Sequence, residues 1–212
     1  MPRAKLKVIG ILCLLTTALL ALAVAHTRAP FAFEEPALKW LGPPSARGTW
    51  ADLAHLLAAP AISAALAVSF VLGLVKRAFL RVAVYAALGA AALLISEHVA
   101  KPLVQRTIYG ELTFPSGHVT AVSATALAMW LALYPLLGTR TRSITLVLGV
   151  TWTLLISLAV VGADWHTPLD AVGSILLSVG IVTGGAAFFE PAGSRGPFMD
   201  AGRAGTRERG RR

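Results

Sequence analysis

Two histidines and an aspartate stand beside chain segments suited to binding an anion. The tetrapeptide Pro115-Ser116-Gly117-His118 directly precedes a long apolar run. Ser116 and Gly117 at a helix start would leave backbone N–H groups unpaired, and Gly117 would let a ligand approach the backbone. The positive end of the helix dipole makes such a turn a potential anion site. The alternative is an ordinary Ser116 N-cap with His118 as an interfacial histidine.

A second candidate pair is His166 and Asp170, which stand four residues apart. On a helix their side chains share one face. A carboxylate bonded to one ring nitrogen fixes the imidazole tautomer and leaves the other nitrogen free for nucleophilic attack. A carboxylate at a membrane span is also costly unless it is paired and used. The alternative is an aspartate that favours a helix N-terminus beside an interfacial histidine.

Two cations, Lys101 and Arg106, precede the tetrapeptide in the segment "SEHVAKPLVQRTIYGE". Alone they would be side chains that reach the membrane interface. Together with the histidines, Asp170 and the Ser-Gly turn on one side of a membrane, they are improbable as separate accidents and indicate a functional anion-binding site. The single cysteine, Cys13, and the absence of a metal-type Cys/His motif predict neither a disulfide nor a metal or other cofactor.

The elements that position these residues are apolar helices. The chain is 56% hydrophobic and 14% charged, which indicates a bilayer rather than water as solvent. Internal backbone pairing favours helices, so the sequence predicts an all-α, six-helix transmembrane bundle with the site at its extracytoplasmic ends. The predicted spans are Val8–Ala25, Ala54–Val75, Val82–Val99, Val119–Leu137, Ile144–Val161 and Leu169–Phe189.

Orientation and domain organisation follow from charge. With a cytoplasmic N-terminus, 14 of the 19 Lys and Arg residues fall inside, so the net charge of +9 is a topology signal rather than a nucleic-acid surface. We expect one cell-membrane domain, 1–190, and a disordered basic cytoplasmic tail, 191–212. The outer loop, 27–52, is expected to be a connector, or else to cover the outer mouth. The first span is expected to be a retained anchor, with a cleaved signal peptide as the alternative.

The motifs resemble those of the type-2 phosphatidic acid phosphatase family, membrane enzymes related to the vanadium haloperoxidases. That family carries K-x6-R-P, then P-S-G-H, then S-R-x5-H-x3-D. The second motif is complete at Pro115 to His118, the third matches through His166-x3-Asp170, and the first matches at Lys101. The resemblance extends from about Ala54 to Phe189.

This resemblance implies a role for each matching residue. His166 would attack phosphorus to form a phosphohistidine, and Asp170 would orient its ring. His118 would protonate the leaving group and then activate the water that releases phosphate. The phosphoryl oxygens would be held without a metal by Lys101, Ser116 and the Gly117 amide.

The chain also departs from the family pattern. Ile108 and Tyr109 stand where the first motif has Arg-Pro, and Ala159-Val160 replaces the Ser-Arg of the third. Arg106, two residues early, is inferred to be a phosphate ligand. Asp164 adds a negative charge near the expected anion.

The leading hypothesis is therefore a lipid-phosphate phosphohydrolase at the outer membrane face. Its substrate would be phosphatidic acid, phosphatidylglycerol phosphate or a polyprenyl pyrophosphate, and its partners that lipid and the surrounding membrane, with no nucleic acid. The missing arginines motivate the alternative of a degenerate, non-catalytic lipid-phosphate binder or scaffold. A transporter is a third reading, disfavoured because the spans carry few charges.

Overall fold

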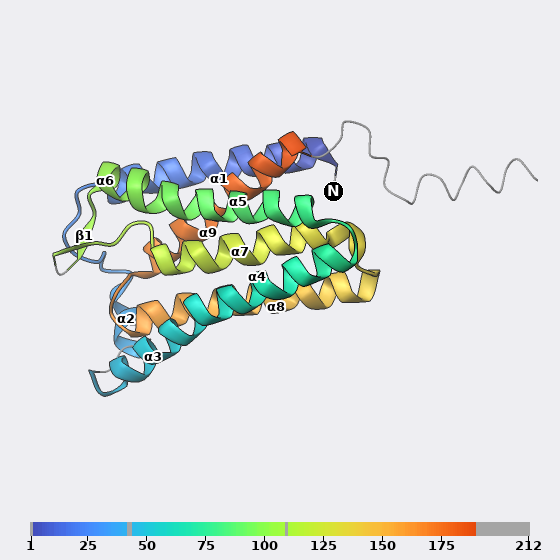
Figure 1. Cartoon of the computed structure of the whole chain (residues 1–212). Helices are drawn as coiled ribbons and strands as arrows, with labels where there is room; N and C mark the ends of the chain where they lie inside the picture. The colour runs from blue at the N-terminus through green and yellow to red at the C-terminus, as the bar shows by residue number, and fades with distance from the viewer. Residues whose placement is uncertain (1, 42–43, 109, 190–212) are drawn as a thin grey trace, which may run out of the picture.

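Long parallel helices dominate the protein (Figure 1). The computed structural model describes residues 2–41, 44–108 and 110–189. Six of its helical segments are long and apolar enough to cross a membrane, which confirms the predicted all-α bundle. They are Arg3–Val24, Arg47–Val75, Phe79–Val104, Gly117–Leu136, Thr139–Gly162 and Pro168–Phe189. The predicted tail, 191–212, lies outside the described residues.

Several spans consist of more than one element. The first is α1 (Arg3–Val24), and the second joins α3 (Arg47–Leu57) to α4 (Ala59–Val75). The third joins α5 (Phe79–Ile95), the π-helical turn η2 (Ser96–Ala100) and α6 (Lys101–Val104). The remaining spans are α7 (Gly117–Leu133) with the 3-10 turn η3 (Tyr134–Leu136), α8 (Thr139–Gly162) and α9 (Pro168–Phe189).

Short elements gather at the end of the bundle that carries the motifs. The loop after α1 contains α2 (Glu35–Leu41) and the 3-10 turn η1 (Pro44–Ala46). Between α6 and α7, β1 (Thr107–Ile108) pairs antiparallel with β2 (Glu111–Leu112), with Thr107 opposite Leu112. Figure 1 shows α2, α3, α6 and β1 together at this end, away from the N-terminus.

The centre of the bundle is built from α7 and α9. Half of the residues in their most apolar stretches are buried, against 17% in α1. Both helices are rich in Ala, Ser, Thr and Gly, small residues that let helices approach closely where no hydrophobic effect drives them together. Buried hydroxyls satisfy one another across this contact; for example, Ser123 Oγ donates to Ser178 Oγ at 2.8 Å.

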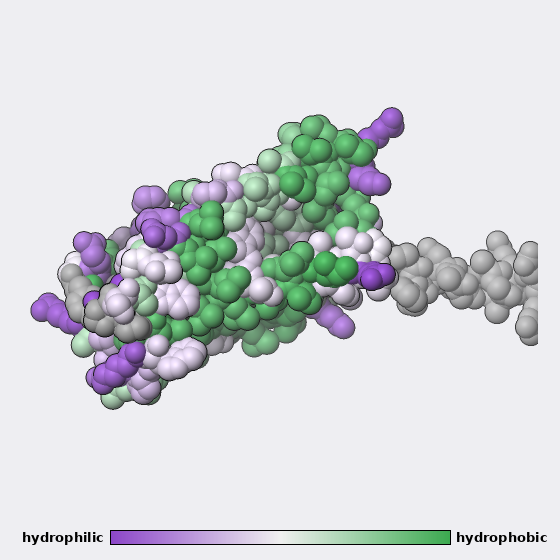
Figure 2. Space-filling model, turned by 90° about the horizontal axis from the view of Figure 1, so that it is seen from below, coloured by the Kyte–Doolittle hydropathy of each residue, from purple (hydrophilic) through white to green (hydrophobic). Residues whose placement is uncertain are grey.

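The outer surface of the bundle suits a lipid environment. Figure 2 shows hydrophobic residues over much of one face, with hydrophilic residues mostly toward its ends. Large side chains such as Leu22 and Leu80 are exposed in the spans. In water such a surface would be unfavourable, whereas in a bilayer it contacts acyl chains. The chain is thus a multi-pass membrane protein.

The packing of α1 on α9 depends on glycine. A Cβ atom at Gly10 would lie 2.9 Å from the Gly184 backbone, and one at Gly180 would lie 2.7 Å from the Leu14 side chain. No real side chain fits at such distances without displacing its neighbour. The two helices therefore touch backbone to backbone at Gly10.

We predict that Gly10→Leu forces α1 away from α9 and destabilises the protein by about 1–3 kcal/mol, the usual cost of overpacking. Thermal unfolding of the purified protein in detergent measures the effect. Gly48→Ala is the control, because no atom lies within 4 Å of a Cβ at that position. Equal melting temperatures for wild type and Gly10→Leu would contradict the close contact of α1 and α9.

Candidate active site

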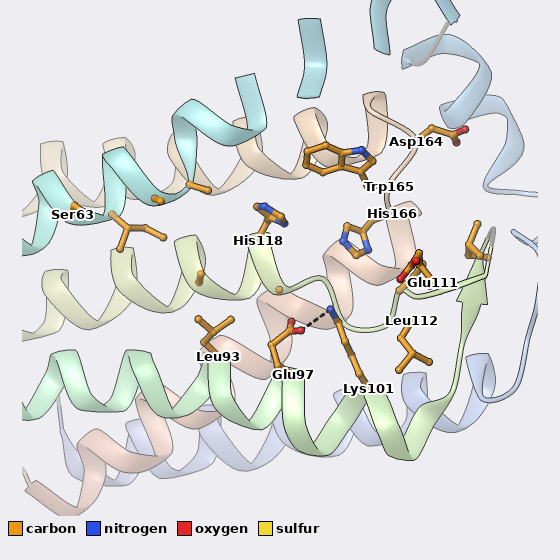
Figure 3. A pocket seen from close by; sticks show the side chains of 17 residues that line it. Ser63, Leu93, Glu97, Lys101, Glu111, Leu112, His118, Asp164, Trp165 and His166 are labelled. Carbon is orange, nitrogen blue, oxygen red and sulfur yellow. Dashed lines mark hydrogen bonds and ion pairs between the residues drawn. The ribbon is translucent and has the colours of Figure 1, made fainter. Parts of the chain in front are cut away.

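A cavity of about 790 Å³ opens among α4, η2, α7 and the loop between α8 and α9. Its lining brings together residues from all three sequence motifs: Lys101, Gly117, His118 and His166. Figure 3 shows the rings of His118 and His166 near one another, with Lys101 reaching toward them from the helix that contains η2 and α6. Residues separated along the chain thus meet in one hollow, as their placement in the sequence predicted.

His166 is placed by a tight turn between α8 and α9. The Trp165 and His166 amides both donate to the Val160 carbonyl, at 3.1 and 3.3 Å. Asp164 in this turn has a φ of +63°, a left-handed conformation that reverses the chain. The His166 side chain is only 10% exposed, and its Nδ1 lies 3.9 Å from Asp170 Oδ2. That distance exceeds a direct hydrogen bond, although the two groups face each other.

The His166 imidazole is neutral in this setting. Burial lowers its pKa to about 3, helped by the positive charge of Lys101 and by His118, and opposed by a backbone hydrogen bond at Thr113. A neutral ring keeps a lone pair at neutral pH. The Nδ1 atom is buried without a hydrogen-bond partner among the described residues. The ring is therefore in the protonation state that a nucleophile requires.

Asp170 is completely buried and held on two sides. Its Oδ2 accepts from the Thr167 amide at 2.8 Å, one half of a capping box that starts α9. Its Oδ1 accepts from Arg106 Nη1 at 3.1 Å. Pro168 at the first helical position has no amide to satisfy. The carboxylate that faces His166 is thereby fixed by the helix start and by a cation.

Arg106 does not reach the cavity, which differs from its expected role as a phosphate ligand. Its side chain is 0% exposed, and Nη2 donates to Glu34 Oε2 at 2.8 Å. The guanidinium group is therefore ion-paired with two carboxylates. A buried cation of this kind is held by its paired charges and is not available to an incoming phosphate.

Glu34 belongs to the outer loop after α1, and sequence reasoning missed it. Its Oε2 also accepts from the Phe31 amide at 2.9 Å, and its Oε1 from the Leu169 amide at 3.1 Å. Burial alone would raise the Glu34 pKa, but the hydrogen bonds that its carboxylate accepts lower it overall. The outer loop is thus not a plain connector, since Glu34 ties it to α9 and to Arg106.

Ser116 and Gly117 play different parts at the start of α7. Ser116 is buried, and its Oγ accepts from the Val119 amide at 3.5 Å as an N-cap. Its own amide donates to Ser174 Oγ on α9 at 2.7 Å. Ser116 does not line the cavity, whereas Gly117 does. Among the described residues no acceptor takes the Gly117 and His118 amides, so both remain open to an anion.

His118 lies in an aromatic group. Its ring centroid is 5.5 Å from that of Trp165 and 6.3 Å from that of His55, a residue of α3. His55 also contacts Trp165 edge-on at 5.1 Å. These contacts hold the His118 ring on the same side of the cavity as the turn that carries His166. His55 and Trp165 carried no motif signal.

Lys101 is paired with Glu97, one helical turn earlier. Its Nζ lies 2.8 Å from Glu97 Oε2, and both residues line the cavity. The i, i+4 spacing could have revealed this pair in the sequence.

The two positions that lack the family arginines are apolar in the structure. Ile108 is nearly buried and lines the cavity, while Ala159 and Val160 are fully buried among α3, α7 and α8. The unexplained Asp164 has a partner: Arg47 of α3 lies 3.0 Å from its Oδ2. Arg47 brings a cation toward the cavity from an element outside the three motifs.

Comparison with known proteins finds a family match and a similar solved structure. Residues 96–192 match the family model described as the PAP2 superfamily. A solved structure described as the first transmembrane PAP2-type phosphatidylglycerolphosphate phosphatase, from Bacillus subtilis, is similar in fold, with a TM-score of 0.65. The two chains share 18% identity over 85% of this chain and 94% of the other. No curated protein sequence matches this chain significantly.

The fold and the cavity define a helical membrane protein with histidines and a lysine grouped around an open helix N-terminus. The matched segment contains Lys101, the Pro115–His118 tetrapeptide and the His166–Asp170 pair. Residues 96–192 thus match the PAP2 superfamily, and the fold is that of a PAP2-type membrane protein, which confirms the resemblance drawn from the motifs.

We predict that Arg106→Met destabilises the protein by about 3–5 kcal/mol, because it leaves the Glu34 and Asp170 carboxylates buried without their cation. Thermal unfolding in detergent measures this. Lys39→Met is the matched control, since Lys39 pairs with Glu35 in the same loop but is 77% exposed, where an ion pair contributes little. Weaker phosphate binding at unchanged stability would instead mark Arg106 as a phosphate ligand.

Proposed function

We propose that the protein is a lipid-phosphate phosphohydrolase that works through a phosphohistidine intermediate. The observation that carries this proposal is the meeting of His118, at the start of α7, and His166, in the turn before α9, in one cavity with Lys101 and the open Gly117 amide. A nucleophile, an acid–base group and two phosphate-binding groups are the parts that phosphoryl transfer needs. The PAP2 superfamily match supports the same reaction class.

His166 is the nucleophile in this proposal. Its Nδ1 faces Asp170, so its Nε2 is the nitrogen that attacks phosphorus. The P–N bond forms as the P–O bond to the leaving group breaks. Asp170, fixed by Arg106 and the Thr167 amide, stabilises the positive charge that the ring acquires. Its carboxylate approaches Nδ1 by the small amount that separates 3.9 Å from a hydrogen bond.

His118 acts as acid and then as base. It gives a proton to the departing oxygen, and it then takes a proton from a water molecule that attacks the phosphohistidine. Phosphate is released and His166 returns to its neutral form. The Lys101 ammonium and the Gly117 amide face the phosphoryl oxygens, where negative charge grows in the transition state. The residues themselves supply the positive groups, so we propose a metal-independent reaction.

The apolar part of the cavity supports a lipid substrate. Ile62, Leu93 and Ala121 line it, and the same three residues line a second cavity of about 180 Å³ deeper between α4, α5 and α7. The phosphate would lie beside the histidines while the acyl or prenyl chain extends between these helices. Phosphatidic acid, phosphatidylglycerol phosphate and polyprenyl pyrophosphates share this chemistry. The named activity of the Bacillus subtilis neighbour makes phosphatidylglycerol phosphate the first substrate to test.

We predict that the purified protein releases phosphate from phosphatidylglycerol phosphate in the presence of EDTA. His166→Ala removes the nucleophile and is expected to reduce the rate to background. Labelled substrate should transfer its phosphate to the wild-type protein in an acid-labile, alkali-stable form. His98→Ala is the matched control, because His98 is exposed on η2 and does not line the cavity. Equal release of phosphate by wild type and His166→Ala would refute the nucleophile assignment, whereas no release by wild type would favour a non-catalytic scaffold.

We also propose that the cavity faces the extracytoplasmic side, as the distribution of basic residues indicates. In a Cys13→Ser background, Lys39→Cys in the outer loop is expected to react with a membrane-impermeant thiol reagent in intact cells. Thr141→Cys, exposed at the opposite end of the bundle, is expected to react only after lysis. The reverse labelling pattern would invert the orientation.

A further inference from the structure

A carboxylate stands inside the cavity beside the phosphate-binding groups. Glu97 belongs to η2, and its Oε2 contacts Lys101 Nζ at 2.8 Å. Figure 3 shows this pair pointing from its helix toward the loop that leads into α7, with His118 and His166 beyond it. The Glu97 side chain remains 35% exposed. A negative charge at this point repels an anionic substrate, so its presence in the cavity needs an explanation.

The second oxygen of this carboxylate is an acceptor without a donor. Glu97 Oε1 is buried and has no hydrogen-bond partner among the described residues. It lies directly against Gly117, so closely that a Cβ atom there would overlap it. Buried carboxylate oxygens almost always accept a hydrogen bond, and an unpaired one is costly. The missing donor therefore belongs at the first turn of α7, where the phosphoryl group is proposed to bind.

We propose that Glu97 accepts a hydrogen bond from a P–OH group of the substrate and thereby selects phosphomonoesters and terminal pyrophosphates over phosphodiesters. This rests on the proposed function of the same site. A monoester with a second pKa of about 6 can carry a proton on a phosphoryl oxygen, whereas a singly charged diester has no such proton to donate. A bound diester would leave Glu97 unpaired and would place two negative oxygens against each other.

Such selection meets a physical need of this site. Phosphodiester lipids form the membrane around the protein, so a cavity that merely attracts phosphate would fill with them. Lys101 is the one Lys or Arg among the described residues that line the cavity, and Glu97 shares it. The pair therefore recognises both features of a protonated monoester: Lys101 contacts a charged oxygen, and Glu97 contacts a hydroxyl. The terminal torsion of a glutamate rotates freely enough for either oxygen to turn into the cavity.

The test compares two lipids that differ only in whether one phosphoryl oxygen carries a proton or a methyl group. These are 1-oleoyl lysophosphatidate and its O-methyl phosphodiester, both singly charged at about pH 5.5. Binding is measured by calorimetry in detergent in a His166→Ala background, so that no substrate is consumed. Glu97→Gln removes the charged acceptor and can donate its own N–H to the diester. We expect the monoester-to-diester affinity ratio to fall roughly tenfold, the worth of one hydrogen bond to a charged group.

Glu111→Gln is the matched control, because it removes the same charge from the same cavity lining without touching Lys101. Its affinity ratio is expected to equal that of the His166→Ala background alone. If Glu97→Gln strengthens both ligands equally, Glu97 only competes for Lys101 and the selection is refuted while the proposed function stands. If the background protein binds neither lipid and wild type releases no phosphate, the proposed function itself fails.

Discussion

The structure at the active end depends on one buried ion cluster, in which Arg106 lies between Glu34 and Asp170. Each charge would be costly alone in this setting, and each is tolerated because it is paired with an opposite charge. The cluster joins the loop after α1, the segment after α6 and the start of α9. It also fixes the carboxylate that faces His166. The same contact therefore positions the proposed nucleophile and holds this end of the bundle together.

A consequence is that charge around the cavity is divided into two sets. Arg106 stabilises the fold through its buried ion pairs, whereas Lys101 and the unpaired amides of α7 face the cavity. Where the family pattern has arginines in its first and third motifs, this chain has the buried apolar residues Ile108 and Val160. Among the described residues that line the cavity, the backbone amides of α7 and Lys101 are the groups left to bind a phosphate. Arg47 is also near, but it is paired with Asp164.

Much of this could be predicted from sequence. The spans are visible because membrane helices satisfy their own backbone and need a minimum apolar length. His118 and His166 were brought together by topology, which places the ends of those spans on one side. The partners of Arg106 could not be predicted, because Glu34 lies far away in a proline-containing loop with no periodic pattern. Ser116 was predicted as a ligand, yet its hydroxyl is committed to the helix cap, a choice that only the geometry of the turn decides.

The Glu34–Arg106–Asp170 contact also bears on how the chain assembles. Glu34 emerges from the ribosome after the first helix, whereas Asp170 arrives only with the last. Until Asp170 is synthesised, Arg106 and Glu34 can pair only with each other. Closure of the cluster thus marks the completion of the bundle, and a chain truncated before its final helix would keep the Arg106–Glu34 pair without its Asp170 partner.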